Sequence, residues 1–202
     1  MSSFSHGNFS NTDLSWYFKD IIAPHLIWHA GKTAESVRTM ATATLCSLAQ
    51  GISESHTQML MPSLMVPLIS LIDDNHVGTR SYTMKLLLHL GPLKYEHLKL
   101  LAPAILSRLD DPGVEVRERA AKCLGKLELN ADELEDDDVV NMWKQLMKQL
   151  LSTMMLHMES PELNLREFLA DSIRQLAKKN PQIYQEAVNE ATITADLQKL
   201  FL

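Results

Sequence analysis

The chain has 202 residues, of which 46% are hydrophobic and 6% aromatic, and its formal net charge is −6. Nucleic-acid binding draws most of its affinity from neutralising phosphates, so this acidic balance argues against a nucleic-acid partner. No run approaches the about 18 uncharged apolar residues of a membrane-spanning helix, and the first residues lack a signal-peptide pattern. We therefore expect a soluble, intracellular protein with no membrane partner.

Residues 1–12 are rich in Ser, Asn and Gly and predict a flexible tail. Asn8, Phe9 and Ser10 match the glycosylation acceptor pattern, which in a cytoplasmic chain is a chance match. From Asp13, apolar residues recur at helical spacing and predict one helix that ends near Gly31.

The end of that helix resembles two kinds of ligand site. Residues 31–33 read GKT, like the end of a phosphate-binding loop, but the loop needs a glycine where Leu26 stands and a strand before it. His25 and His29 lie one helical turn apart, yet the metalloprotease glutamate and a third ligand are missing. We expect no nucleotide, metal or other cofactor, and no small-molecule substrate.

A pattern led by arginine occurs four times in the chain. Two columns, seven and ten residues after the arginine, are aliphatic in every copy. The reference arginines, which are 42, 37 and 49 residues apart, are Arg38, Arg80, Arg117 and Arg166. The spacing straddles the period of about 40–47 residues typical of paired-helix HEAT or armadillo arrays. The third copy is apolar at Val116, Ala120, Cys123, Leu124 and Leu127, one buried helical face.

These features predict an all-α fold, an α-solenoid of about four HEAT repeats formed by paired antiparallel helices. A turn aspartate, a Val-Arg opening and a proline in the first helix favour HEAT over armadillo. We expect a single domain over residues 13–202, with repeats near 13–52, 53–93, 94–130 and 139–180. Residues 181–202 form a cap, because a solenoid must cover its last apolar face. Asp111 is expected to cap the second helix of the third repeat, with Pro112 in its first turn.

Sulfur-containing residues fall where the repeats predict helices. Cys46 and Cys123 lie in second helices and are interpreted as small core residues of a reducing compartment. Met59, Met61 and Met65 have the spacing of gap-filling core residues, and the alternative is an adaptable groove for an apolar partner segment.

Residues 128–138 form an acidic stretch, ELNADELEDDD, with no basic residue. One interpretation is a solvated linker that begins the next helix, whose N-terminus favours negative charge. The other is a docking strip for a basic partner.

Charged residues at fixed positions in the repeats predict a structural ladder rather than catalysis. An acid stands seven residues before the arginine in three copies, where it could meet an arginine of its own or an adjacent repeat through paired hydrogen bonds. The ladder residues are Asp73, Arg80, Asp110, Asp111, Arg117, Glu159 and Arg166. No nucleophile elbow, phosphate loop or zinc spacing is present, so we expect no catalytic residue and no enzyme activity.

Positions two, five and nine after each arginine form a stripe beside the buried face. Its middle is aromatic and basic in an otherwise acidic chain, which fits either ordinary solvated surface or a docking face for an acidic or helical segment. The residues predicted to bind protein are Tyr82, Lys85, His89, Arg119, Lys122 and Lys126.

Two segments resemble a known family. Residues 28–34, WHAGKTA, followed by Val37 and Arg38, and residues 107–111, SRLDD, with Val116 and Arg117, are similar to the C-terminal repeats of HEAT-repeat axonemal dynein assembly factors. The resemblance implies a cytoplasmic, non-catalytic scaffold for preassembly of axonemal dynein arms. The implied partners are dynein chains, other assembly factors or chaperones. A generic HEAT scaffold, like a transport receptor or phosphatase scaffold, is the alternative.

Overall fold

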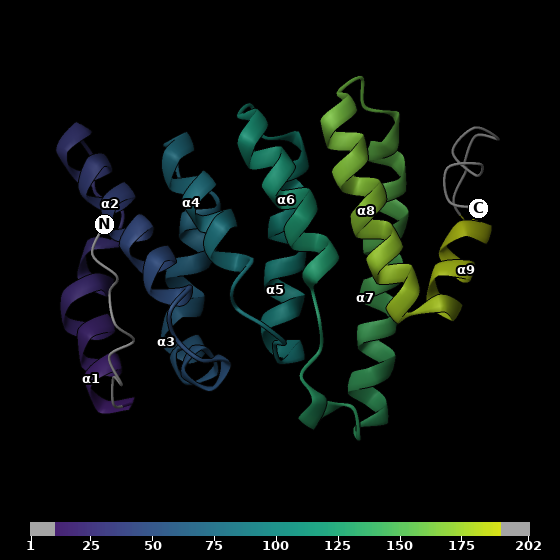
Figure 1. Ribbon diagram of the computed structural model, residues 1–202, viewed down its shortest axis with the longest axis horizontal. Coiled ribbons are helices and arrows are strands. Elements are labelled where there is room, and N and C mark those ends of the chain that lie inside the picture. The colour runs from purple at the N-terminus through teal and green to yellow at the C-terminus, as the bar shows by residue number, and fades with distance from the viewer. Residues whose placement is uncertain (1–10, 191–202) are drawn as a thin grey trace. The chain divides into compact units, whose positions relative to one another are not determined.

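The computed structural model describes residues 11–190, and within them the chain is helical (Figure 1). It divides into two compact units, Met1–Leu90 and Gly91–Leu202. The only β-pairing in the described part is a single bridge between Leu93 and Leu129. No helix in residues 11–190 is long and apolar enough to cross a membrane. The predicted tail, except its last two residues, and the last part of the predicted cap lie outside the described residues.

The first unit begins with an irregular stretch. A short helix, α1 (Asn11–Trp16), passes into a π-helical segment (Tyr17–Ile22) and then a 3-10 turn (Ala23–His25). The prediction of one continuous helix here is therefore wrong, and Pro24 supplies a physical reason because its ring nitrogen has no N–H to donate. Three regular helices follow: α2 (Lys32–Ala49), α3 (Glu54–Ile72) and α4 (Val77–Leu87).

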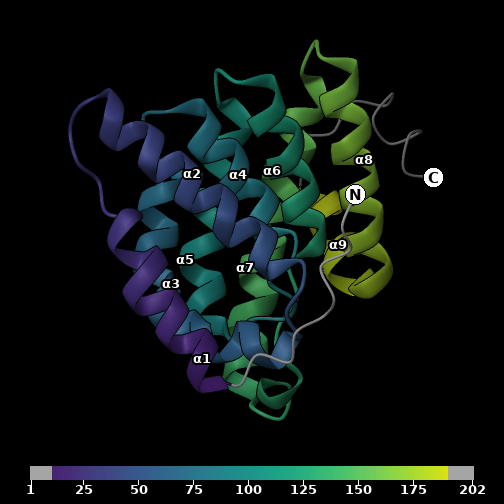
Figure 2. The same cartoon turned by 60° about the vertical axis from the view of Figure 1, so that its left-hand side comes forward.

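The core of the first unit lies where α4 packs against both α2 and α3, and Figure 2 shows α2 lying beside α4. Leu68, Leu71 and Met84 have no exposed surface. Met61 and Met65 are buried as well, and Met59 is 37% exposed. Met61 and Met65 therefore fill core space, so they cannot line the adaptable groove of the alternative interpretation.

The second unit contains two helix pairs and a further helix. Its elements are α5 (Tyr95–Leu106), α6 (Val114–Lys126), α7 (Asp137–Leu156), α8 (Leu163–Lys179) and α9 (Pro181–Glu190). Within each pair α5 packs on α6 and α7 on α8, and the pairs stack through α5 on α7 and α6 on α8 (Figure 1). All five residues predicted to form the buried face of α6 are buried. The all-α repeat prediction is thus confirmed.

The helices α6 and α8 approach closely at Gly125. A Cβ added at this glycine would lie 2.6 Å from the Cβ of Ser172 and 2.7 Å from its Cα. The Ser172 hydroxyl donates a 2.7 Å hydrogen bond to the Ala121 carbonyl. Glycine is therefore required for this contact, which fixes the register of the two second helices.

The acidic stretch is largely used by the fold. Leu129 is buried and its neighbours pair with Leu93, and the Glu133 carboxylate accepts a 2.6 Å hydrogen bond from the Tyr95 N–H at the start of α5. Asp136 is the N-cap of α7 and accepts hydrogen bonds from the N–H groups of Asp138 and Val139. These contacts agree with the interpretation of a linker that begins the next helix.

Candidate protein-binding surface

Each repeat arginine of α4, α6 and α8 holds the turn that precedes its own helix. Its Nη1 donates to the backbone carbonyl of the residue six positions earlier. The pairs are Arg80 with Asp74 at 2.7 Å, Arg117 with Asp111 at 2.5 Å, and Arg166 with Ser160 at 3.2 Å. Three repeats thus contain the same contact, which we call the arginine clamp.

The side chain of the clamped residue completes the turn. The Asp74 carboxylate accepts from the His76 N–H at 2.8 Å, and the Asp111 carboxylate accepts from the Gly113 N–H at 2.8 Å. The third repeat therefore differs from the prediction: α6 begins at Val114 with Gly113 as N-cap, and Pro112 lies before the helix. Asp111 folds the turn instead of capping the helix, because its carboxylate bonds the N–H two residues on.

Two bidentate ion pairs connect neighbouring repeats within a unit. In the first unit Arg38 of α2 donates from Nε to Asp74 Oδ2 at 2.5 Å and from Nη2 to Oδ1 at 3.2 Å. Both side chains are nearly inaccessible, at 3% and 2% exposure. In the second unit Arg117 of α6 donates to both oxygens of Glu162, at 3.2 and 2.5 Å. Bidentate geometry of this kind is the strong form of the interaction.

Three of the four acids selected from the sequence lie one residue before the clamped position, and the fourth, Asp111, is itself clamped. Asp73 is the C-cap of α3 and is exposed, and Glu159 is exposed in a 3-10 turn. Asp110 is 81% exposed and contacts His157 at 3.4 Å. The sequence interpretation missed Asp74 and Glu162. Asp74 could have been found, because it and Asp111 both stand six residues before the repeat arginine.

The stripe of second-helix positions is accessible in the first unit. Tyr82 is 39% exposed, His89 is exposed, and Lys85 is half-buried. Met40, at the equivalent position on α2, is 71% exposed. An aromatic ring and a flexible apolar side chain at the surface are typical of contact residues.

The stripe in the second unit is partly organised by its own contacts. The Lys122 ammonium lies over the Phe168 ring, 3.7 Å from its centroid, and so joins α6 to α8. Arg119 forms an ion pair with Glu115 one turn earlier, and Lys126 is exposed at the end of α6. The result is a cationic and aromatic surface, within this unit, on two second helices.

The titratable groups with shifted pKa values lie mainly in the core. Burial raises the pKa of the Cys123 thiol far above its ordinary value, and burial lowers the pKa of His97. The His97 Nδ1 atom is buried without a hydrogen-bond partner. In residues 11–190, no group of three His, Cys, Asp or Glu side chains is arranged to hold a metal ion.

The relatives found by comparison with known proteins carry the same name. No family model matches the chain. The protein named dynein axonemal assembly factor 5 from Drosophila melanogaster is 35% identical over 189 residues, covering 93% of this chain and 22% of that protein. The Xenopus laevis protein of the same name is 26% identical over 85% of this chain and 21% of its own length. The human protein is 25% identical over 78% of this chain and 19% of its own length.

Solved structures with the same fold are helical repeat proteins. A designed armadillo repeat protein in complex with the peptide (KR)4 superposes with a TM-score of 0.54 at 14% identity, covering 95% of this chain and 84% of that one. A computationally designed armadillo repeat protein for modular peptide recognition gives a TM-score of 0.57 at 16% identity, covering 94% and 79%. Over 93% of its residues, the chain is homologous to a segment of dynein axonemal assembly factor 5 and spans about a fifth of that protein's length.

Proposed function

We propose that this chain is a non-catalytic scaffold segment in the cytoplasmic preassembly of axonemal dynein arms. The observation that carries the proposal is the 35% identity to dynein axonemal assembly factor 5 over nearly the whole chain. Its partners are dynein chains, other assembly factors or chaperones. Their binding site is the exposed stripe on the second helices, with Arg119, Lys122 and Lys126 as its basic part.

The structural use of the polar groups supports a non-catalytic role. The most buried ion pair, between Arg38 and Asp74, holds two repeats together. The arginine clamps occupy the Asp111 carbonyl and its counterparts in two other turns. The thiol of Cys123 is buried and kept protonated, which makes it unreactive. These groups therefore serve the packing of the repeats, which supports a scaffold.

The chemistry of the stripe favours an acidic partner segment. Lys122 is held in place by Phe168, so it loses little conformational entropy on binding a carboxylate. Arg119 already shares its charge with Glu115, which leaves Lys122 and Lys126 as the cations most available to a partner. Aromatic and arginine residues of the kind present here commonly anchor interfaces.

The test is affinity purification of the chain from the cytoplasm of ciliated cells, with bound proteins identified by mass spectrometry. The test variant carries Arg119→Glu, Lys122→Glu and Lys126→Glu. The matched control carries Lys94→Glu, Lys99→Glu and Lys178→Glu, three exposed residues of the same unit outside the stripe. Both variants change the net charge equally.

We expect the wild type and the control to capture axonemal dynein chains or other dynein assembly factors, and the stripe variant to lose them. Circular dichroism verifies that all three proteins are folded. Capture that is equal in the stripe variant would remove the assigned surface. Failure of all three proteins to capture any dynein chain or assembly factor would contradict the proposed role itself.

A further inference from the structure

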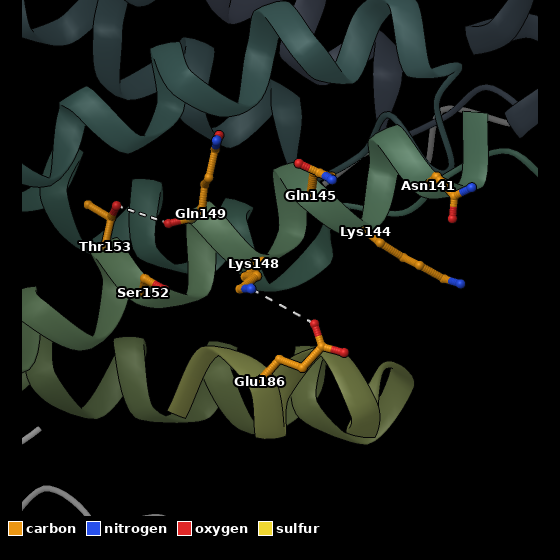
Figure 3. A pocket seen from close by; sticks show the side chains of 8 residues that line it. All are labelled: Asn141, Lys144, Gln145, Lys148, Gln149, Ser152, Thr153 and Glu186. Carbon is orange, nitrogen blue, oxygen red and sulfur yellow. Dashed lines mark hydrogen bonds and ion pairs between the residues drawn. The ribbon is translucent and has the colours of Figure 1, made fainter. Parts of the chain in front are cut away.

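A second surface, distinct from the stripe, lies along α7 beside α9. It is a hollow of about 810 Å³ that is open to solvent. Seven of its eight lining residues belong to α7, and the eighth is Glu186 of α9. In Figure 3 the Glu186 carboxylate points toward Lys148, whereas Gln145 and Gln149 leave α7 on the side away from α9.

The α7 residues that line this groove form two rows of side chains at four-residue spacing. Asn141, Gln145 and Gln149 form an amide row, and Lys144 and Lys148 form a lysine row beside it. Four residues of α-helix rise about 6.0 Å, and two residues of an extended chain rise about 6.4–6.8 Å. Successive amides can therefore meet successive dipeptides of a segment that lies along α7.

The amides select an extended segment over a helical one. Each side-chain amide offers both a donor and an acceptor, which is what an unpaired peptide group requires. A helix satisfies its own backbone groups and would leave the amide row unused. The opposite face of α7 buries Trp143 and Met147, so the row is fixed to the core of its unit.

The lysine row sets the charge of the segment. In an extended chain alternate side chains point to the same side, at the spacing that separates Lys144 from Lys148. Acidic residues at alternate positions would therefore face both ammonium groups. Lys148 Nζ lies 3.9 Å from Glu186 Oε2, so Glu186 competes with an incoming carboxylate for this lysine.

We propose that the groove of α7 and α9 binds an extended peptide segment with acidic residues at alternate positions, its main chain on the amide row and its carboxylates on Lys144 and Lys148. This site is separate from the stripe and does not depend on the role in dynein assembly.

The experiment uses the full chain and a fluorescein-labelled six-residue peptide of alternating glutamate and threonine, followed by fluorescence anisotropy. Comparison peptides replace glutamate by lysine, or carry N-methyl groups on alternate peptide bonds. A single-stranded DNA hexamer tests whether the lysines bind any anion. We expect the acidic peptide to bind at least tenfold more tightly than each of these three.

Four variants assign the contacts. Gln145→Ala with Gln149→Ala should weaken binding about fivefold to a hundredfold, as loss of two hydrogen bonds implies. Lys144→Gln with Lys148→Gln should weaken binding and remove most of its salt dependence. Glu186→Gln should tighten it, because the competing carboxylate is gone. The control pair Lys99→Gln with Lys178→Gln should bind like the wild type.

Opposite results would overturn the proposal. These are no binding of the acidic peptide, equal binding of the N-methylated peptide or the DNA, or weaker binding in Glu186→Gln. An equal loss in the control pair would show only non-specific attraction to positive charge. The Glu186→Gln and N-methyl results hold even if an amide-row variant fails to fold.

Discussion

The buried pair of Arg38 and Asp74 provides the sharpest test of the repeat packing. We consider Asp74→Ala, which removes the carboxylate and leaves the Arg38 guanidinium in place. The Arg38 side chain is 3% exposed, and it also donates a 3.3 Å hydrogen bond to the His29 carbonyl. The substitution also removes the acceptor for the His76 N–H at the start of α4.

The structure implies a large loss of stability. Removing one member of a buried ion pair leaves an uncompensated charge in a region that water does not reach, at a cost of about 3–5 kcal/mol. Replacing both members, with Arg38→Met and Asp74→Leu, removes both charges and keeps apolar volume. We expect this double variant to be less destabilised than Asp74→Ala alone, since paired charges replaced by apolar groups are often nearly neutral.

The measurement is urea unfolding at neutral pH followed by circular dichroism. The matched control is Asp171→Ala, which removes the exposed ion pair with Arg174, where the side chains are 64% and 54% exposed. Such a pair contributes less than about 1 kcal/mol. The reasoning would be refuted if Asp74→Ala cost no more than Asp171→Ala, or if the double variant were the less stable of the two Asp74 variants.

Three further predictions concern the second unit. Gly125→Ala should lower the free energy of unfolding by about 1–3 kcal/mol despite the better helix propensity of alanine, because the new Cβ would collide with Ser172. Urea unfolding measures this loss, and adding Ser172→Gly to the Gly125→Ala variant should restore part of it. The Cys123 thiol should react with a chromogenic disulfide reagent only after urea is added, since burial keeps it protonated; rapid reaction in the folded protein would contradict this. Folding lowers the pKa of His97, so the unfolded state binds more protons at this residue and stability falls as the pH drops below about 6.5. The melting temperature of His97→Leu should therefore change less between pH 7 and pH 5 than that of the wild type. An equal change in the two proteins would contradict the role of His97.

The helical core could be predicted from the sequence because apolar spacing is a local property that packing then uses. The column ten residues after the arginine includes Leu90, Leu127 and Leu176, all buried. The first repeat follows the pattern less closely: Val37 is 40% exposed, and its neighbour Arg38 is buried. The bidentate bond to Asp74 explains why, since it turns the charged residue of α2 inward.

The contacts between turns and helices could not be predicted to the residue. The sequence shows that Asp74 stands six residues before Arg80, but its bond to Arg38 of the neighbouring repeat depends on the fold. Glu162 meets Arg117 from 45 positions away, a partner that no local pattern identifies. The groove on α7 was missed for another reason. Uncharged amides do not stand out in the charge pattern of the sequence. Glu186 lines the groove only because α9 packs against α7.

Arginine and lysine residues have different roles in this chain. The repeat arginines hold turns and neighbouring repeats, where a planar guanidinium with several fixed donors can bond a carboxylate and a carbonyl together, as Arg117 does. The basic residues of the groove, Lys144 and Lys148, are lysines, and so is the cation on Phe168. An ammonium on a flexible stem suits contacts that form and break with a partner. Partner preference can therefore change through the lysines, for example at Lys148, while the arginines continue to hold the repeats.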